Sequence, residues 1–152
     1  MFDFFQIIDF NGKHNIKNAK YSFLKLYLYD KVEGIEYFKD FKNSKACFLE
    51  REKTDKNCFN KKGKNIFLFG TVYTNDLYKE VSGHNLQIIY ADFICELLDK
   101  YDDDIVKYIK GSFVIVIYDE LKNNVKVISD RLNVLPLYYS FKDNLLIISS
   151  SV

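Results

Sequence analysis

Proline, glycine and cysteine are scarce in this chain, and tryptophan is absent. It has one proline, six glycines, three cysteines and no tryptophan in 152 residues. Cys47, Cys58 and Cys95 are widely spaced and odd in number, which excludes a simple disulfide framework or zinc knuckle and predicts reduced thiols. No apolar run reaches the roughly 20 residues of a membrane span. The N-terminus also lacks the basic lead and cleavage site of a secretory signal. These absences predict a cytoplasmic protein with no membrane partner.

An excess of charge of one sign is also missing. There are 22 basic and 21 acidic residues, which give a formal net charge of +1. A nucleic-acid partner recruited by bulk charge is therefore not expected. Lysines and phenylalanines alternate between Lys39 and Lys64, but acidic residues dilute them, so the pattern favours a solvated face over a nucleic-acid stripe.

Apolar and aromatic residues are abundant. They include 14 Phe and 12 Tyr, and apolar residues make up 48% of the chain. The composition is that of a globular protein, and the length fits one domain over residues 1–152 that buries roughly two-thirds of its unfolded surface.

Apolar periodicity and turn residues predict a mixed fold. Strands are expected at residues 2–10, 21–29, 46–49 and 66–73, and a polar, lysine-rich loop over 54–64. Gly70 lies inside the last of these strands, where glycine usually marks a bulge or a close backbone approach. Tyr90, Ile94, Leu97, Leu98 and Tyr101 fall on one helical stripe.

The chain after this helix predicts a turn of helix and then hairpins. Asp102, Asp103 and Asp104 are expected to cap a short helix through Ile109, with Gly111 at its C-terminal end, rather than to bind a metal. Residues 113–118 are apolar on both faces, so this strand should be covered on both sides. Turns at 122–124 and 142–144 precede two further strands, which together predict stacked antiparallel sheets flanked by helices.

The last forty residues carry a recognisable order of motifs. Gly-Ser-Phe, an apolar run and Tyr-Asp occupy residues 111–119, Asp-Arg-Leu-x-x-x-Pro-Leu-Tyr-Tyr occupies 130–139, and Leu-Leu-Ile-Ile-Ser-Ser occupies 145–150. This order of motifs resembles the class II glutamine amidotransferase domain of asparagine synthetases, over residues 66–151. The resemblance implies an α+β fold, a four-layer α-β-β-α sandwich of the N-terminal-nucleophile kind. It also implies an architectural role for Asp130, Arg131, Pro136, Tyr138 and Tyr139, with a structural ion pair between Asp130 and Arg131.

The residues that perform the chemistry of that family are mostly replaced. Its nucleophile is a cysteine exposed by removal of Met1, activated by its own α-amine, and Phe2 stands there in this chain. Two glycines beside the nucleophile are Asp3 and Gln6. The Asn-Gly pair of the oxyanion hole aligns with Phe69 and Gly70, so Gly70 is the one retained substrate-binding candidate.

The glutamine-binding residues of the family also lack clear counterparts. Its Ser-Asp pair aligns with Ile89 and Tyr90, although a local gap would bring in Asp92. Arg51 is the one candidate for the carboxylate-binding arginine, and its context does not match. The internal cysteines have no adjacent α-amine, and His14 and His84 are expected to be exposed loop residues rather than activating bases.

Three functions remain open from the sequence. The first is a catalytically degenerate scaffold of an ATP-dependent amide-forming enzyme, as the resemblance to β-lactam synthetases and lasso-peptide cyclases implies. The second is a stand-alone module that binds a small ligand or peptide, and the third is a surviving glutaminase. The domain itself should hold no cofactor or metal; ATP and Mg²⁺ are expected in a downstream synthetase domain, in cis or as a split partner, and a homodimer is an alternative assembly.

Overall fold

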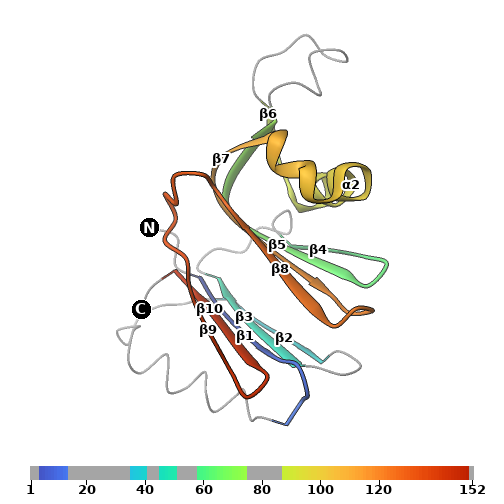
Figure 1. The fold of residues 1–152 in the computed structure, drawn as a ribbon, viewed down its shortest axis with the longest axis vertical. Helices are drawn as coiled ribbons and strands as arrows, with labels where there is room; N and C mark the ends of the chain where they lie inside the picture. The colour runs from blue at the N-terminus through green and yellow to red at the C-terminus, as the bar shows by residue number, and fades with distance from the viewer. Residues whose placement is uncertain (1–3, 14–34, 41–44, 51–57, 75–86, 151–152) are drawn as a thin grey trace. The chain divides into compact units, whose positions relative to one another are not determined.

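The computed structural model describes residues 4–13, 35–40, 45–50, 58–74 and 87–150. Within them the protein is an α+β fold made mostly of strands, with two antiparallel sheets, one α-helix and one 3₁₀ helix (Figure 1). The chain divides into two compact units, residues 1–53 with 136–152 and residues 54–135. Each sheet belongs to one unit. The strand expected at 21–29 lies outside the described residues.

The first unit contains a five-stranded sheet in the order β2-β3-β1-β10-β9. Its strands are β1 (Phe4–Asp9), β2 (Ile35–Asp40), β3 (Lys45–Glu50), β9 (Tyr138–Lys142) and β10 (Leu145–Ser149). The central strand β1 pairs with both β3 and β10, and its residues Ile7 and Ile8 are fully buried on opposite faces. The expected strand at 2–10 and the expected short strand at 46–49 are confirmed.

Two hairpins have tight turns in which two successive residues have positive φ angles, which few residue types adopt readily. Asp143 and Asn144 join β9 to β10 with φ of 51° and 63°. Lys62 and Gly63 have φ of 52° and 79° between β4 (Cys58–Lys61) and β5 (Lys64–Thr74). Two successive residues with positive φ match the right-handed twist of the strands that they connect.

The second unit contains the sheet β4-β5-β7-β8, with β6 (Gln87–Ile89) paired to β5. β7 (Ile109–Asp119) lies between β5 and β8 (Asn124–Ser129), and every residue from Phe113 to Asp119 is buried. The expected burial of residues 113–118 is therefore confirmed. The turn after β7 is closed by the Asp119 carboxylate, which accepts hydrogen bonds from the backbone N–H groups of Leu121 and Lys122.

One face of this sheet is covered by α2 (Ala91–Tyr101) and the 3₁₀ helix η1 (Asp102–Lys107) (Figure 1). The predicted stripe is largely right, because Ile94, Leu97 and Leu98 are buried, whereas Tyr90 precedes the helix and is partly exposed. The apolar cluster under the helix draws on both sheet and helix. Its members are Ile66, Leu68, Val72, Ile89, Ala91, Ile94, Cys95, Leu97, Leu98, Ile105, Ile109, Phe113, Ile115, Ile117 and Ile128.

Two local predictions in this unit are wrong. The polar loop expected over 54–64 contains β4, because the Lys62–Gly63 turn allows residues 58–61 to pair with β5. Gly111 does not end a helix; it lies inside β7 opposite Val72 with φ of 133°. A Cβ atom there would lie 2.1 Å from the Thr71 carbonyl oxygen, so close backbone approach explains the glycine.

The three aspartates in the first turn of η1 do not cap it with their side chains. The helix ends at Lys107 and has no side-chain capping bond at its N-terminus. Asp104 instead forms an ion pair with Lys107 at 2.7 Å, and Asp102 and Asp103 both contact the Lys126 ammonium group. All three carboxylates are exposed and pair with lysine ammonium groups, and none of them accepts a capping hydrogen bond from a backbone N–H group.

Candidate functional site

Gly70 lies in β5 at a point where the backbone approaches its neighbour closely. It pairs with Phe113 of β7 and has φ of 87°. A Cβ atom at this position would lie 2.2 Å from the carbonyl oxygen of Ser112 and 2.7 Å from Cδ1 of Leu135. The predicted close approach is correct. Leu135 brings an apolar side chain against the one residue that the expected substrate pocket retains.

Phe69, the residue before it, is 6% exposed and lies opposite Val114 in the same ladder. A phenyl ring has no hydrogen-bond donor, so it offers nothing to a developing oxyanion. The position that aligns with the amide of an oxyanion hole is thus occupied by a buried hydrocarbon side chain.

Gln6 occupies the centre of β1. Its side chain is fully buried, and neither polar atom of its amide has a hydrogen-bond partner among the described residues. The resemblance predicts that Gln6 replaces a glycine of the family, and its long side chain is accommodated in the interior. A buried amide without partners costs about 1–3 kcal/mol, so the residue is costly as well as space-filling. Phe2 and Asp3 lie outside the described residues.

Asp130 organises the segment between β8 and β9. The residue is 6% exposed, and its carboxylate accepts hydrogen bonds from the backbone N–H groups of Leu132 at 3.0 Å, Val134 at 3.1 Å and Phe113 at 3.3 Å. Two backbone bonds add to these: the Asp130 N–H donates to the Phe113 carbonyl, and the Asn133 N–H donates to the Asp130 carbonyl. One side chain therefore fixes both the loop and the start of the buried part of β7.

The other residues of the motif are at the surface. Arg131 is exposed and, among the contacts of the described residues, forms no ion pair with Asp130; the expected ion pair is replaced by backbone hydrogen bonds to the carboxylate. Pro136 is exposed just before β9, and Tyr138 and Tyr139 are 45% and 77% exposed on that strand. Only Asp130 of this motif points inward.

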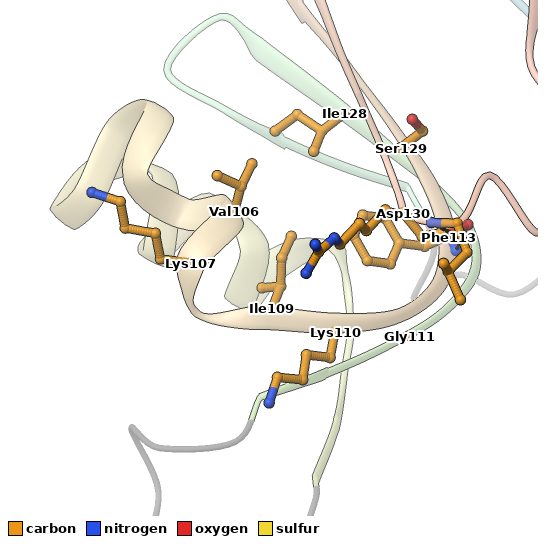
Figure 2. A pocket seen from close by; sticks show the side chains of 11 residues that line it. Val106, Lys107, Ile109, Lys110, Gly111, Phe113, Ile128, Ser129 and Asp130 are labelled. Carbon is orange, nitrogen blue, oxygen red and sulfur yellow. Dashed lines mark hydrogen bonds between the residues drawn. The ribbon is translucent and has the colours of Figure 1, made fainter.

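An open pocket of about 830 Å³ lies beside this segment (Figure 2). Ile109, Phe113 and Ile128 form its apolar part, and they extend from the cluster under α2. Cationic side chains of Lys107, Lys110 and Arg131 also line it. The hydrogen bond to the Asp104 carboxylate raises the pKa of the Lys107 ammonium group, which stays charged but is already paired with an anion.

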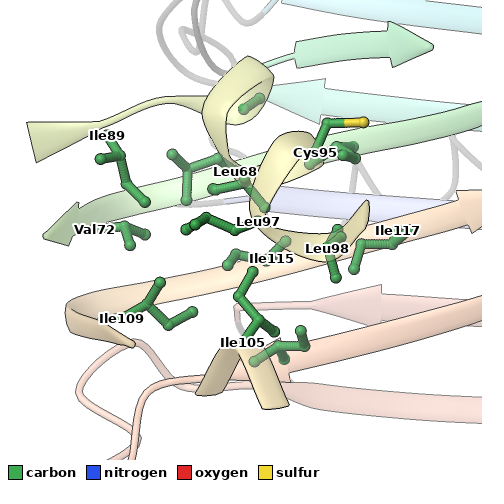
Figure 3. Packing of buried hydrophobic residues seen from close by; sticks show 14 of the residues in the cluster. Leu68, Val72, Ile89, Cys95, Leu97, Leu98, Ile105, Ile109, Ile115 and Ile117 are labelled. Atoms are coloured by element: carbon green, nitrogen blue, oxygen red, sulfur yellow. The ribbon is translucent and has the colours of Figure 1, made fainter. Parts of the chain in front are cut away.

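The Cys95 thiol is not an activated nucleophile. It is 1% exposed within the cluster under α2 (Figure 3). Burial raises its pKa, and the nearby Asp99 carboxylate adds to the effect, so the neutral thiol is favoured. Cys58 is a half-buried cysteine in β4. His14, His84 and Arg51 lie outside the described residues, so the expectations for these three residues stay predictions.

The residues aligned with the glutamine-binding pair do not form a charged site. Ile89 is buried in the apolar cluster, and Tyr90 precedes α2. Asp92 is exposed in the first turn of α2, where its carboxylate accepts the N–H of Phe93. No group of three or more potential metal-ligating side chains occurs among the described residues.

Comparison with known families gives one clear result. The model of the glutamine amidotransferase domain family matches residues 49–152, well over half of the chain. The chain therefore belongs to the glutamine amidotransferase domain family. A search of curated proteins finds no matching sequence. None of the helices in the described segments has the length and apolarity needed to cross a membrane.

The sequence predicts the importance of Phe69, Gly70 and Asp130, but neither the contact of Leu135 with Gly70 nor the burial of Gln6. Leu135 is one apolar residue in a loop, and nothing in its local pattern indicates contact with Gly70, 65 positions earlier. Gln6 was identified as a replaced glycine. Its complete burial follows from the pairing of β1 between β3 and β10, which a single sequence does not reveal.

Proposed function

We propose that this domain has lost glutamine hydrolysis and serves as a structural scaffold for the synthetase part of an ATP-dependent amide-forming enzyme of the asparagine synthetase kind. The observation that carries the proposal is the buried Phe69 beside Gly70, where an oxyanion hole needs an amide donor. Removing one such donor costs a factor of about 10²–10³ in turnover even when the nucleophile is intact.

The buried Gln6 supports the same conclusion from another strand. Its side chain occupies the position at which the family keeps a glycine for substrate access. The chain has Phe2 in place of the nucleophilic cysteine, and the two cysteines whose thiols the structure describes are internal. Loss of the nucleophile alone removes most of the rate of a covalent mechanism.

The scaffold role implies particular assembly and chemistry. The two sheets would be the inner layers of the α-β-β-α sandwich that the resemblance implies. ATP and Mg²⁺ would bind in the synthetase part, which adenylates a carboxylate for attack by an amine. The cytoplasm, where thiols stay reduced, suits such an enzyme.

Glutamine hydrolysis by the purified chain tests the loss of activity. We expect no ammonia release above a blank without protein, with or without the synthetase part. Ammonia release that a glutamine-directed alkylating agent abolishes would contradict the proposal. The variant Phe69→Asn is a useful companion, because restoring a single amide without a nucleophile should leave the chain inactive.

A second function, a small-ligand module, is favoured by the pocket beside Asp130. Its apolar part and its lysine and arginine side chains suit an anion with an apolar body. The coding sequence downstream of Val152 separates the two functions: a Ser-Gly-Gly-x-Asp-Ser pyrophosphate loop there supports the scaffold. Thermal stabilisation of the chain by aromatic carboxylates, reduced in Arg131→Ala, would favour the module.

A further inference from the structure

β9 is the most exposed strand among those whose side chains the structure describes. All five residues from Tyr138 to Lys142 are exposed, including Tyr139 at 77% and Phe141 at 60%. β9 is also the outermost described strand of its sheet, with β10 on its inner side. Aromatic side chains on an outer strand with few charges are features of a strand that pairs with another chain.

The register of the hairpin shows which backbone groups of β9 face outward. Lys142 and Leu145 flank the two-residue turn and therefore form a hydrogen-bonded pair. Hydrogen-bonded and non-hydrogen-bonded pairs alternate along an antiparallel ladder, so Ser140 and Tyr138 also bond to β10. The N–H and C=O groups of Tyr139 and Phe141 consequently point away from β10.

The sequence of β9 is complementary to itself around Ser140. In an antiparallel pairing with a two-fold axis at Ser140, Tyr139 of one copy lies opposite Phe141 of the other, and these are the residues whose backbone groups face outward. Tyr138 lies opposite Lys142, so no like charges face each other. Aromatic cross-strand pairs stabilise such ladders by about 0.2–1 kcal/mol each.

Other two-fold registers pair fewer residues of β9 with the second copy. A two-fold axis at Tyr139 or at Phe141 also lets the outward backbone groups pair. With the axis at Tyr139, Lys142 lies beyond the paired residues. With the axis at Phe141, Tyr139 lies opposite Asp143, which belongs to the turn. The axis at Ser140 is the one that pairs all five residues. Phe141 is also held by an edge-to-face contact with Phe10, with ring centroids 6.1 Å apart, which prepares the strand for pairing.

We propose that two copies of this chain associate by antiparallel pairing of β9 with β9, centred on Ser140. The pairing joins the two sheets of the first units into one continuous sheet with an isologous interface. It is independent of the proposed scaffold role, because it requires no synthetase partner and no feature of the degenerate site.

Disulfide cross-linking tests the register directly. At the two-fold axis Ser140 forms a non-hydrogen-bonded pair with itself, with Cα atoms about 4.5 Å apart, which a disulfide can bridge. Ser140→Cys in the full chain should give a covalent dimer under mild oxidation on non-reducing gels. Lys142→Cys, on a residue that is also exposed, should not, since residue 142 lies opposite Tyr138. The wild-type chain controls for the three native cysteines.

A backbone variant tests the association without relying on cysteine chemistry. Tyr139→Pro removes an outward N–H that β10 does not use, so it should raise the dissociation constant of the dimer at least about tenfold while the melting temperature of the monomer changes little. Tyr139→Phe should retain the dimer, as sedimentation equilibrium would show. A wild-type chain that stays monomeric, or equal cross-linking of both cysteine variants, would overturn the proposal. So would a 1:1 complex in which a synthetase domain covers β9.

Discussion

β7 and β9 both belong to the motif that identifies the family, yet they have opposite environments. From Phe113 to Asp119 every residue of β7 is buried, and all five residues of β9 are exposed. Both strands are rich in apolar or aromatic side chains. β7 has β5 and β8 on its two sides, whereas β9 has a described neighbour only in β10. Position within the sheet, rather than aromatic content, decides burial.

The comparison is sharpest for the same substitution in each strand. Ile115→Asp in β7 should unfold the protein, because it places an unpaired carboxylate in the apolar cluster, at a cost above about 4 kcal/mol. Tyr139→Asp in β9 should change the free energy of unfolding of the monomer by less than about 1 kcal/mol. Chemical denaturation followed by circular dichroism measures both. Equal losses would mean that β9 is not an exposed strand.

A second substitution tests what holds the start of β7 in place. Asp130→Ala should destabilise the protein by about 3 kcal/mol, since it leaves the N–H groups of Leu132, Val134 and Phe113 without their acceptor. Arg131→Ala, the neighbouring control, should be within about 0.5 kcal/mol of wild type. Urea melts of both variants give the difference; a larger effect at Arg131 would restore the ion pair that the motif suggested.

In the sheet that contains β9, a stabilising change is expected. Gln6→Met keeps the length of the side chain and removes an amide that has no hydrogen-bond partner in the described part of the chain, so stability should rise by about 1 kcal/mol. Gln6→Glu, of the same size, should destabilise strongly because it buries a charge. A loss of stability in Gln6→Met would indicate that the amide binds a group such as an ordered water.

The smallest effect is expected where α2 contacts the strand next to β7. The hydrogen bond from Lys64 lowers the pKa of the Asp99 carboxyl, and the pair is 3.0 Å apart with both side chains part-exposed. A lowered folded pKa contributes stability above the ordinary aspartate pKa of about 3.9, and that stability is lost as the pH falls. Lys64→Met should cost at most about 0.5 kcal/mol at neutral pH and nothing in strong acid. An effect that persists in acid would point to packing instead.

Much of the fold was predictable because buried strands and helices have characteristic patterns of apolar residues. The apolar run of β7, the stripe Ile94, Leu97 and Leu98, and the turn residues before β10 were all read correctly. The sequence does not predict β4, because only Cys58 and Phe59 of its four residues are apolar and the turn that follows lacks the usual Asn-Gly. Gly111 was misassigned because glycine ends helices and permits close backbone approach equally well.

The candidate site was predictable in identity but not in environment. The resemblance indicated which positions were replaced, including Phe69 and Gln6. It could not show that Gln6 lacks partners, that Leu135 contacts Gly70, or that Asp130 binds backbone rather than Arg131. These facts depend on residues distant in sequence, and local patterns carry no information about such contacts.

The pairing of β1 with β10 has a consequence for how the chain is made. Ile7 pairs with Ile147, so the first sheet cannot close until its last strand has left the ribosome. The second unit is one continuous segment, Thr54 to Leu135, whose hairpins are local. We therefore expect the second unit to fold first during synthesis, while the edge of β1 that pairs with β10 stays exposed until the last strand is made.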